Sequence, residues 1–167
     1  MDNGEPRHRP AVRVVCLDGA QRVLLLRWKD PGDGSWLWEP PGGGIDPGET
    51  PFDTARRELG EETGLDGGAV LDRFVDVERD VWWDGRHITG PEQFFLARLA
   101  AERPALVRTG LMPDEQLMLH GHAWLDPAGL AELEAGPDRL EPPSLRAVIA
   151  ALTEPDGPGP WSLSGAT

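Results

Sequence analysis

The sequence predicts an α/β protein, specifically an α/β/α sandwich in which helices flank a mixed β-sheet. The length of 167 residues suits one domain with a normal hydrophobic core. Short apolar runs typical of strands are interleaved with three segments that begin with proline and whose apolar residues recur at helical spacing. No internal repeat or linker interrupts the chain. We therefore expect a single domain over residues 1–167, with its core at about 10–152.

The first part of the chain predicts a hairpin followed by a short third strand. Strands are expected at 11–17 and 22–28, and the dipeptide Asp18-Gly19 between them is a turn signal. The third strand is expected at 36–39, after a loop rich in aspartate and glycine. This strand leads directly into a run of prolines and glycines, so the chain must turn tightly just beyond it.

A helix is expected from Pro51 to Thr63 because both of its ends carry sequence signals. Thr50 supplies a capping hydroxyl, and proline occupies the first helical position. Gly64 is expected to end the helix in the left-handed conformation. The apolar residues that would dock this helix lie on one stripe and are Phe52, Ala55 and Leu59.

The remainder of the chain predicts further strands, two helices and a tail. The expected elements are strands at 70–81, 92–99 and 117–125 and helices at 127–135 and 142–152. A turn is expected near 83–86, between the first two of these strands. The segment 153–167 is rich in proline, glycine and serine and is expected to form a mobile tail, in which Trp161 is suited to docking.

Three glutamates near the end of the 51–63 helix are the most informative feature of the chain. At about 100° per residue, Glu61 and Glu62 lie within roughly 60° on either side of Glu58, so the three carboxylates share one edge. Like charges at these spacings destabilise a helix, and acidic groups near its C-terminus oppose the helix dipole. A divalent cation held by hard oxygen ligands would compensate for both effects. The pattern predicts a metal site, and a solvated acidic face is the alternative interpretation.

The residues around these glutamates resemble the signature of a known family. Gly43, five residues, Glu49, seven residues, Arg57-Glu58-Leu59, one residue, Glu61-Glu62, one residue and Gly64-Leu65 match the Nudix box at every fixed position. The resemblance implies a Mg²⁺- or Mn²⁺-dependent hydrolase that cleaves a diphosphate linked to another group, X. It also implies the α/β/α fold of that family.

The resemblance implies a role for each matched position. The metal ligands would be three carboxylates and one carbonyl, those of Glu58, Glu61, Glu62 and Gly42. The structural positions would be the ion pair of Arg57 with Glu49 and the two glycines Gly43 and Gly64. A general base must also accept the proton of the attacking water. Besides the box glutamates, Glu115 in an expected loop is the candidate catalytic base, with an ordinary exposed acid as the alternative.

The composition limits which binding partners and which cellular compartment we expect. The formal net charge of −13 argues against binding of extended nucleic acid through a broad basic surface. A small anionic nucleotide is compatible with this charge because a bound metal reverses the local field. No long apolar run and no basic-then-apolar start are present, so neither a membrane span nor a signal peptide is expected. The single Cys16 suits a core thiol in a reducing cytoplasm, and a homodimer is left open.

Aromatic and basic residues are the candidates for binding the substrate. The chain has seven tryptophans and no tyrosine, and flat aromatic faces can hold a nucleobase by stacking. Trp36 and Trp38 have the same strand parity and precede the glycine run, and Trp83 lies near an expected turn. Arg27 and Arg79 are candidates for contacts with phosphate or ribose. Core packing for the tryptophans and a surface position for the arginines are the alternatives.

Three functions remain open on the sequence alone. The first is hydrolysis of a nucleotide sugar or a related nucleoside diphosphate derivative. The second is hydrolysis of a nucleoside triphosphate, including an oxidised one, and the third is nucleotide sensing without catalysis. Because Glu58, Glu61 and Glu62 are all present, the sequence favours a hydrolase over a sensor.

Overall fold

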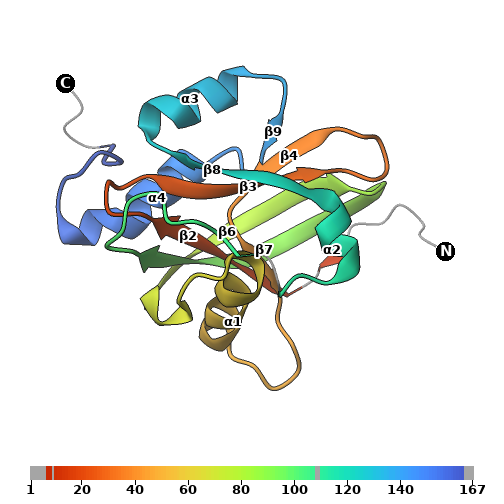
Figure 1. Ribbon diagram of the computed structural model, residues 1–167, viewed down its shortest axis with the longest axis horizontal. Coiled ribbons are helices and arrows are strands. Elements are labelled where there is room, and N and C mark those ends of the chain that lie inside the picture. Colours follow the sequence, from red (N-terminus) through yellow and green to blue (C-terminus); the bar gives the residue numbers. More distant parts are fainter. Residues whose placement is uncertain (1–6, 9, 108–109, 164–167) are drawn as a thin grey trace.

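The computed structural model describes residues 7–8, 10–107 and 110–163, and helices flank a mixed sheet in it (Figure 1). Within these residues the strands are β1 (Arg7–His8), β2 (Ala11–Leu17), β3 (Val23–Lys29), β4 (Trp36–Glu39), β5 (Gly42–Gly44), β6 (Val70–Trp83), β7 (Arg86–Arg98), β8 (Leu119–Leu125) and β9 (Arg139–Leu140). The helices are α1 (Pro51–Thr63), α2 (Pro113–Met118), α3 (Pro127–Ala135) and α4 (Leu145–Thr153), with 3₁₀ turns η1 (Gly67–Ala69) and η2 (Glu154–Asp156). The predicted fold class is confirmed.

The sheet divides into two arms. Its hydrogen-bonded order is β1-β7-β2-β3-β4-β9, with β5 paired to β2, β6 to β7 and β8 to β3. Strands β2 and β3 pair at Leu17 and Val23, next to their connecting turn. Farther along, β2 pairs with β5 and β7, whereas β3 pairs with β4 and β8. We call these the β2 arm (β2, β5, β6, β7) and the β3 arm (β3, β4, β8).

The N-terminal strands agree closely with the sequence prediction, and the central hairpin is longer than predicted. The strands at 11–17 and 36–39 are confirmed, and the one expected at 22–28 is displaced by one residue. In the hairpin, β6 and β7 continue to a two-residue turn at Asp84 and Gly85, where φ is 51° and 72°. A turn with both central residues at positive φ matches the twist of its strands, so the strands run up to it without a break.

Helix α1 forms where its end signals predict it. The Thr50 hydroxyl accepts a hydrogen bond from the Asp53 N–H at 3.1 Å. Gly64 has a φ of 73° and donates its N–H to the Gly60 carbonyl, which closes the C-terminus. A side chain at Gly64 would be strained by this backbone conformation and would also meet Val107 at 2.7 Å.

The segment before β8 was expected to be a loop and is instead helix α2. Pro113 occupies its first turn, and the Glu115 carboxylate accepts a hydrogen bond from the Met112 N–H at 3.0 Å. These two features start a short helix. Because this helix takes residues 113–118, β8 begins at Leu119 rather than at 117 as predicted.

The C-terminal region also differs from the prediction. Helix α4 begins at Leu145, three residues later than expected, after the cis Glu141–Pro142 peptide. In place of a free tail, residues 154–163 are attached to the body of the protein through Asp156, which binds Arg73 and Arg98, and through Trp161. Trp161 is 3% exposed and donates its indole N–H to the Gln21 carbonyl at 2.6 Å. Residues 164–167 of the expected tail lie outside the described part of the chain.

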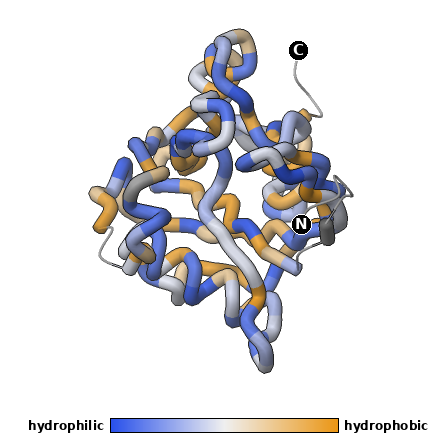
Figure 2. The backbone as a smooth tube through the Cα atoms, turned by 90° about the vertical axis from the view of Figure 1, so that its right-hand side faces the viewer, coloured by the Kyte–Doolittle hydropathy of each residue, from blue (hydrophilic) through white to orange (hydrophobic). Residues whose placement is uncertain are grey.

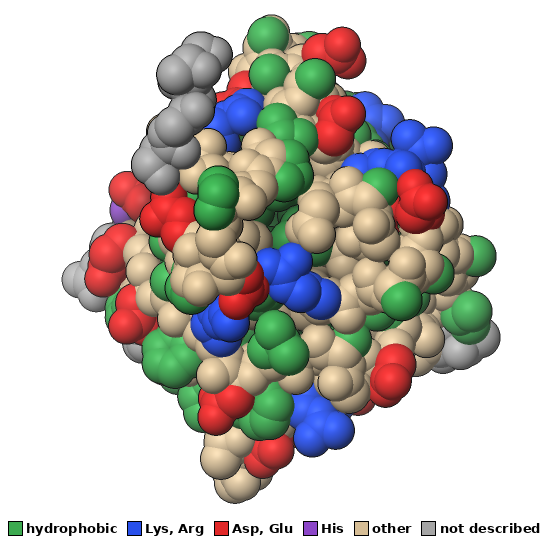
Figure 3. Space-filling view, turned by 90° about the vertical axis from the view of Figure 1, so that its left-hand side faces the viewer, with side chains coloured by type: hydrophobic (Ala, Val, Ile, Leu, Met, Phe, Trp, Pro, Cys, Tyr) green, Lys and Arg blue, Asp and Glu red, His purple; other side chains and the backbone are tan. Residues whose placement is uncertain are grey.

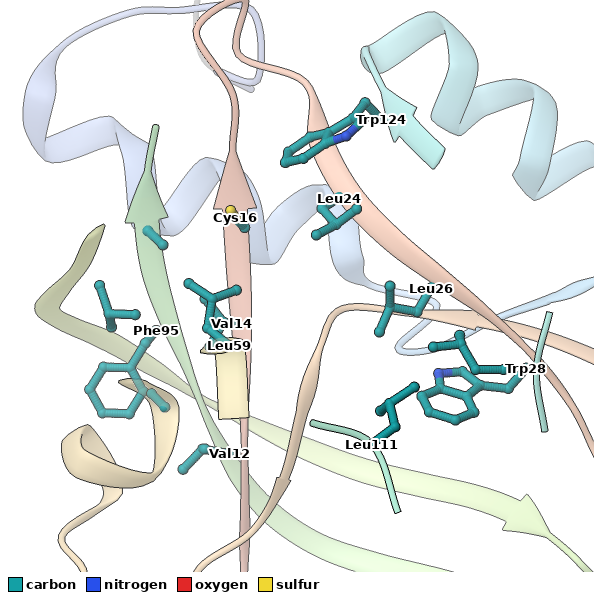
Figure 4. Close-up of a cluster of buried hydrophobic side chains, with 14 residues drawn as sticks. Val12, Val14, Cys16, Leu24, Leu26, Trp28, Leu59, Phe95, Leu111 and Trp124 are labelled. Carbon is teal, nitrogen blue, oxygen red and sulfur yellow. The ribbon is translucent and has the colours of Figure 1, made fainter. Parts of the chain in front are cut away.

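Two hydrophobic clusters occupy the interior. The first packs α1 against the sheet and includes Val14, Leu26, Leu59 and Phe95 (Figure 4). The second packs α3, α4 and Trp161 against the sheet. In Figure 2, hydrophobic stretches concentrate in the strands that cross the middle of the molecule. Among the described residues, no helix is long and apolar enough to cross a membrane.

Candidate active site

A cavity of about 640 Å³ opens between the two arms of the sheet, α1 and α2. Its polar lining comes from seven elements and the loop before α1 and consists of Arg13, Glu39, Gly42, Gly43, Gly44, Asp46, Arg57, Glu58, Glu61, Glu62, Arg79, Glu92 and Glu115. Its apolar lining consists of Ala11, Trp28, Leu37, Val81, Trp83, Ile88, Met112 and Met118. The volume is within the usual range for a small-molecule site.

All three box glutamates line this cavity, but in different environments. Glu62 is 3% exposed, Glu58 is 9% exposed and Glu61 is exposed to solvent. The Glu62 carboxylate accepts a hydrogen bond from the Gly42 N–H at 2.7 Å, which ties the end of α1 to β5. The edge of α1 that the sequence identified therefore faces the cavity.

Burial and like charges disfavour the ionised form of the inner glutamates. Burial raises the pKa of Glu62 well above its ordinary value, against the opposing effects of Arg13 and the Gly42 N–H. The pKa of Glu58 is also raised, first by burial and further by the charges of Glu61 and Glu115. The cavity thus holds more negative charge than its own cations compensate.

The expected ion pair between Arg57 and Glu49 is present and bidentate. The Arg57 Nε and Nη2 atoms lie 2.7 Å and 2.8 Å from the two carboxylate oxygens of Glu49. Arg57 also donates to the Gly44 carbonyl at 3.1 Å, so it joins the loop before α1 to the glycine strand. The hydrogen bonds from Arg57, and after them the one from the Asp46 N–H, lower the pKa of Glu49 to about 2.

The glycine strand β5 fits its surroundings because it has no side chains. A Cβ atom at Gly43 would lie 2.5 Å from the Glu58 carboxylate, and one at Gly42 would lie 2.1 Å from the Val12 carbonyl oxygen. These distances are shorter than any normal contact. The absence of a Cβ at Gly43 therefore allows the Glu58 carboxylate to lie directly against the strand.

Glu115 reaches the same cavity from α2 rather than from a loop. It lines the cavity, and its charge contributes to the raised pKa of Glu58 on α1. Two separate helices thus bring carboxylates to one space. The sequence correctly singled out the residue, but it gave the wrong local structure because residues 111–116 looked irregular and a strand was expected from 117.

The predicted substrate residues separate into two groups. Trp83 and Arg79 line the cavity. Trp36, Trp38 and Arg27 do not, which corrects the expectation that the two tryptophans face the site. Alternation along β4 turns Leu37 and Glu39 toward the cavity, so the tryptophans point to the other side.

The side of β4 away from the cavity has its own contacts. The Arg27 guanidinium lies 3.9 Å from the centre of the Trp36 ring. Asp138 binds both this guanidinium, at 3.2 Å, and the Trp38 indole N–H, at 2.8 Å. These contacts explain the positions of Arg27 and Trp38 by packing within the protein, without a ligand.

Sequence reasoning missed five charged or aromatic residues that line the cavity: Arg13, Trp28, Glu39, Asp46 and Glu92. A weak signal existed for Arg13, which interrupts the apolar strand 11–17, and for Glu39, which directly precedes the proline and glycine run. Neither signal identifies a partner, because their contacts join strands that are far apart in the sequence.

The donors around the cavity fit a hard divalent cation, although they do not enclose one point. Among the described residues, no three carboxylates, imidazoles or thiols are grouped closely enough to hold a metal ion. Arg57 holds Glu58 and Glu61, each at 3.0 Å, and the Gly42 N–H holds Glu62. The donor set nonetheless consists of carboxylate oxygens, which suit Mg²⁺ or Mn²⁺. Burial is the main cause of the raised pKa of Glu62, and the charges of Glu58 and Glu39 add to it; a bound cation would favour the ionised form of this carboxylate.

Comparison with known proteins agrees with this geometry. Residues 7–147 match the model of the NUDIX domain. An RNA pyrophosphohydrolase of Sphingopyxis alaskensis is 29% identical over 175 residues, which cover 95% of this chain and 98% of that protein. A putative 8-oxo-dGTP diphosphatase of Bacillus subtilis is 38% identical over 76 residues, or 45% of this chain and 47% of that protein.

Solved structures with similar folds include two hydrolases. The C. elegans Ap4A hydrolase in a binary complex has a TM-score of 0.59 and 19% identity, covering 86% of this chain and 96% of its own. The E. coli dihydroneopterin triphosphate pyrophosphohydrolase has a TM-score of 0.58 and 23% identity, covering 88% and 97%. At these identities the likeness supports the fold. With the family match over most of its length, the chain belongs to the NUDIX domain family and is a Nudix pyrophosphohydrolase.

Proposed function

We propose that this chain hydrolyses the diphosphate bond of a nucleoside diphosphate linked to a second group X, with Mg²⁺ or Mn²⁺ as cofactor. Nucleotide sugars are the first candidate substrates. The observation that carries the proposal is the convergence of three carboxylates from α1 and one from α2 on a single cavity beside a glycine strand. Carboxylates crowded in this way suit a cation that joins them to a diphosphate.

The residues present would divide the work as follows. Glu58, Glu61 and Glu62 would hold the metal, with the Gly42 carbonyl as a further donor. A divalent cation bound there neutralises phosphoryl charge and makes an attacking water more acidic. The Gly42 N–H orients Glu62, and the absence of a side chain at Gly43 leaves room for Glu58.

Glu115 is our candidate general base. It would take one proton from the attacking water while the water oxygen bonds to one phosphorus atom. The bond from that phosphorus to the bridging oxygen breaks, and the second phosphate leaves with its substituent. The position of Glu115 on α2, across from Glu58, supports this role because both carboxylates line the space that the diphosphate would occupy.

The arginines of the cavity are already paired, which makes a cation necessary for phosphate binding. Arg57 is engaged by Glu49, Glu58 and Glu61, and Arg79 is engaged by Glu39 and Glu92. None of these pairings leaves a guanidinium whose charge is uncompensated by a carboxylate. We therefore expect binding of the diphosphate to depend on the metal.

The apolar side of the cavity supports a nucleotide as the ligand. Trp28, Trp83 and Ile88 lie on it, and flat aromatic and apolar surfaces suit a nucleobase. A small nucleotide also suits the surface charge. On the face shown in Figure 3, acidic and basic side chains of the described residues are interspersed rather than gathered into a broad basic surface.

A second candidate is the hydrolysis of a nucleoside triphosphate. It is favoured by the name of the Bacillus subtilis relative, a putative 8-oxo-dGTP diphosphatase. The name of the Sphingopyxis alaskensis relative adds the 5′ end of an RNA as a substrate to be tested. Both share with the first candidate a nucleotide whose phosphate anhydride would lie at the glutamates.

Product analysis on a defined panel tests the proposal. The purified chain is incubated with Mg²⁺ and, separately, a nucleotide sugar, a triphosphate of the same nucleoside, its 8-oxo form and a 5′-triphosphorylated RNA. Release of nucleoside monophosphate and sugar phosphate supports the first candidate, whereas release of pyrophosphate supports the second. Loss of turnover with a chelator, and a fall in kcat of about three orders of magnitude in Glu62→Gln, are expected. Tight binding without turnover would overturn the proposal in favour of a nucleotide sensor.

A further inference from the structure

Four charged residues form a closed ring at the base of the cavity. Arg13 lies 3.1 Å from the Glu39 carboxylate and 3.6 Å from that of Glu92. Arg79 lies 3.2 Å from Glu39 and also donates to Glu92. Each arginine thus contacts both glutamates, and positive and negative groups alternate around the ring. We call these four residues the Arg–Glu ring.

The Arg–Glu ring joins the two arms of the sheet. Arg13, Arg79 and Glu92 belong to β2, β6 and β7, whereas Glu39 belongs to β4 on the β3 arm. All four side chains are largely buried, with exposed fractions between 2% and 15%. Buried ion pairs are often no more stabilising than apolar residues of similar volume. A ring of this kind at a ligand cavity therefore calls for a functional explanation as well as a structural one.

The charge of the ring determines which group could lie against it. Two guanidinium groups and two carboxylates compensate each other, so the ring offers no net positive charge to a phosphate. Arg13 and Glu39 of the ring also act electrostatically on Glu62, and all three residues line the same cavity, so the ring lies next to the carboxylates assigned to the metal. A terminal phosphate at this end of the cavity would face the carboxylates of Glu39 and Glu92.

The ring nevertheless retains hydrogen-bonding capacity toward a neutral group. Both arginines contact Oε1 of Glu92, and this leaves Oε2 outside the ring contacts. A carboxylate oxygen accepts hydrogen bonds from hydroxyl groups. Glu92 lines the cavity, and the Nε atoms of Arg13 and Arg79 are buried without a hydrogen-bond partner among the described residues, so a hydroxyl group, which both donates and accepts, suits the ring.

We propose that the Arg–Glu ring determines the specificity of the site by accepting a neutral, hydroxyl-bearing group X and disfavouring a terminal phosphate in its place. The inference rests on the proposed function and decides between its two candidate substrates. It selects a glycosyl group or another neutral polyol, linked through diphosphate to the nucleoside. Like charges placed in opposition at a binding site suppress the wrong ligand.

The first test uses the unaltered chain. The value of kcat/KM is measured with Mg²⁺ for a nucleotide sugar and for the triphosphate of the same nucleoside. A preference for the nucleotide sugar of at least about tenfold is expected, the scale on which single pocket contacts discriminate. An equal or greater kcat/KM for the triphosphate would overturn the inference while leaving the metal-dependent hydrolase intact.

The second test changes the charge of the ring. Glu92→Gln leaves two guanidinium groups against one carboxylate, so a terminal phosphate should become acceptable and the preference should fall by about tenfold. The matched control is Glu78→Gln on β6, an exposed carboxylate outside the cavity, which should leave the preference unchanged. Equal effects of Glu92→Gln on both substrates would contradict the inference, since they would indicate a merely structural role.

Two further measurements test the inference if Glu92→Gln does not fold or if the chain shows no turnover. If Glu92→Gln does not fold, as judged by circular dichroism, Glu39→Gln removes a ring carboxylate from the other arm and should shift the preference in the same direction. If the unaltered chain turns over no nucleotide, the proposed function fails. Calorimetry of the two ligands with Mg²⁺ then still tests the ring: tighter binding of the nucleotide sugar supports the inference, and tighter binding of the triphosphate overturns it.

Discussion

Helices α1 and α4 cover opposite hydrophobic clusters of the same sheet, but they do so with different residues. The buried residues of α1 are Thr54, Ala55, Glu58, Leu59, Glu62 and Thr63. Those of α4 are Leu145, Val148, Ile149, Ala150 and Leu152. Four of the six in α1 are polar, whereas all five in α4 are apolar. Helix α1 therefore gives part of its packing surface to the active site.

The two helices are also defined in different ways. Helix α1 has a side-chain cap at Thr50 and a left-handed glycine at its end. Helix α4 has no side-chain hydrogen bond at its N-cap, Ser144, and is held by burial of its apolar face. A helix that carries a site of like charges thus needs strong local signals, whereas a packing helix can rely on the hydrophobic effect.

The largest expected effect comes from Glu62→Gln on α1. The glutamine oxygen can still accept the Gly42 N–H, but it would lose the charge that we assign to metal binding. We expect kcat to fall by about three orders of magnitude and the Tm to stay the same or rise, because a buried charge is removed. Activity assays and thermal melts check this. Near-normal turnover would show that Glu62 does not bind the metal; Glu61→Gln is expected to behave similarly in turnover.

The counterpart on α4 is Ile149→Ala. Ile149 is fully buried in the second cluster, so its truncation should reduce the free energy of unfolding by about 2–5 kcal/mol. The kcat of the folded fraction should remain unchanged, because α4 contributes nothing to the cavity lining. Denaturant unfolding and turnover at low temperature give both values. A large fall in kcat without a loss of stability would contradict the assignment of α4 to packing and of α1 to the active site.

A smaller effect is expected from Glu49→Ala, which removes the bidentate partner of Arg57. The loop before α1 should lose its main attachment, and the Tm should fall by less than in Ile149→Ala because the pair is only partly buried. Turnover should fall less than in Glu62→Gln. Differential scanning calorimetry measures the change, and an unaltered Tm would show that the ion pair does not stabilise the loop.

The smallest effect concerns the acid stability of the α4 side. Hydrogen bonds from Arg73 and Arg98 lower the pKa of Asp156 from 3.8 to about 2, and Arg73 also binds the Leu152 carbonyl at the end of α4. Because the folded-state pKa is depressed, the stabilisation is present above pH 3.8 and is lost as pH falls toward 2. Asp156→Asn should therefore be less stable than the unaltered chain near pH 6, with the difference shrinking below pH 4. A difference independent of pH would exclude this linkage.

The sequence by itself determined the features that depend on neighbouring residues. The bounds of α1, its caps, the shared edge of Glu58, Glu61 and Glu62, and the pairing of Arg57 with Glu49 all follow from spacings within about 20 residues. Helical periodicity and capping chemistry act over this range. The family followed from the same short stretch.

The tertiary structure decided everything that joins distant parts of the chain. The Arg–Glu ring combines four strands, α2 brings Glu115 to the cavity, and the alternation of β4 turns Leu37 and Glu39 rather than the tryptophans inward. The Trp161 indole is buried because a surface was available to it at Gln21, which its own composition does not reveal. Such contacts depend on strand pairing and on the space left between packed elements, and local propensity carries no information about either.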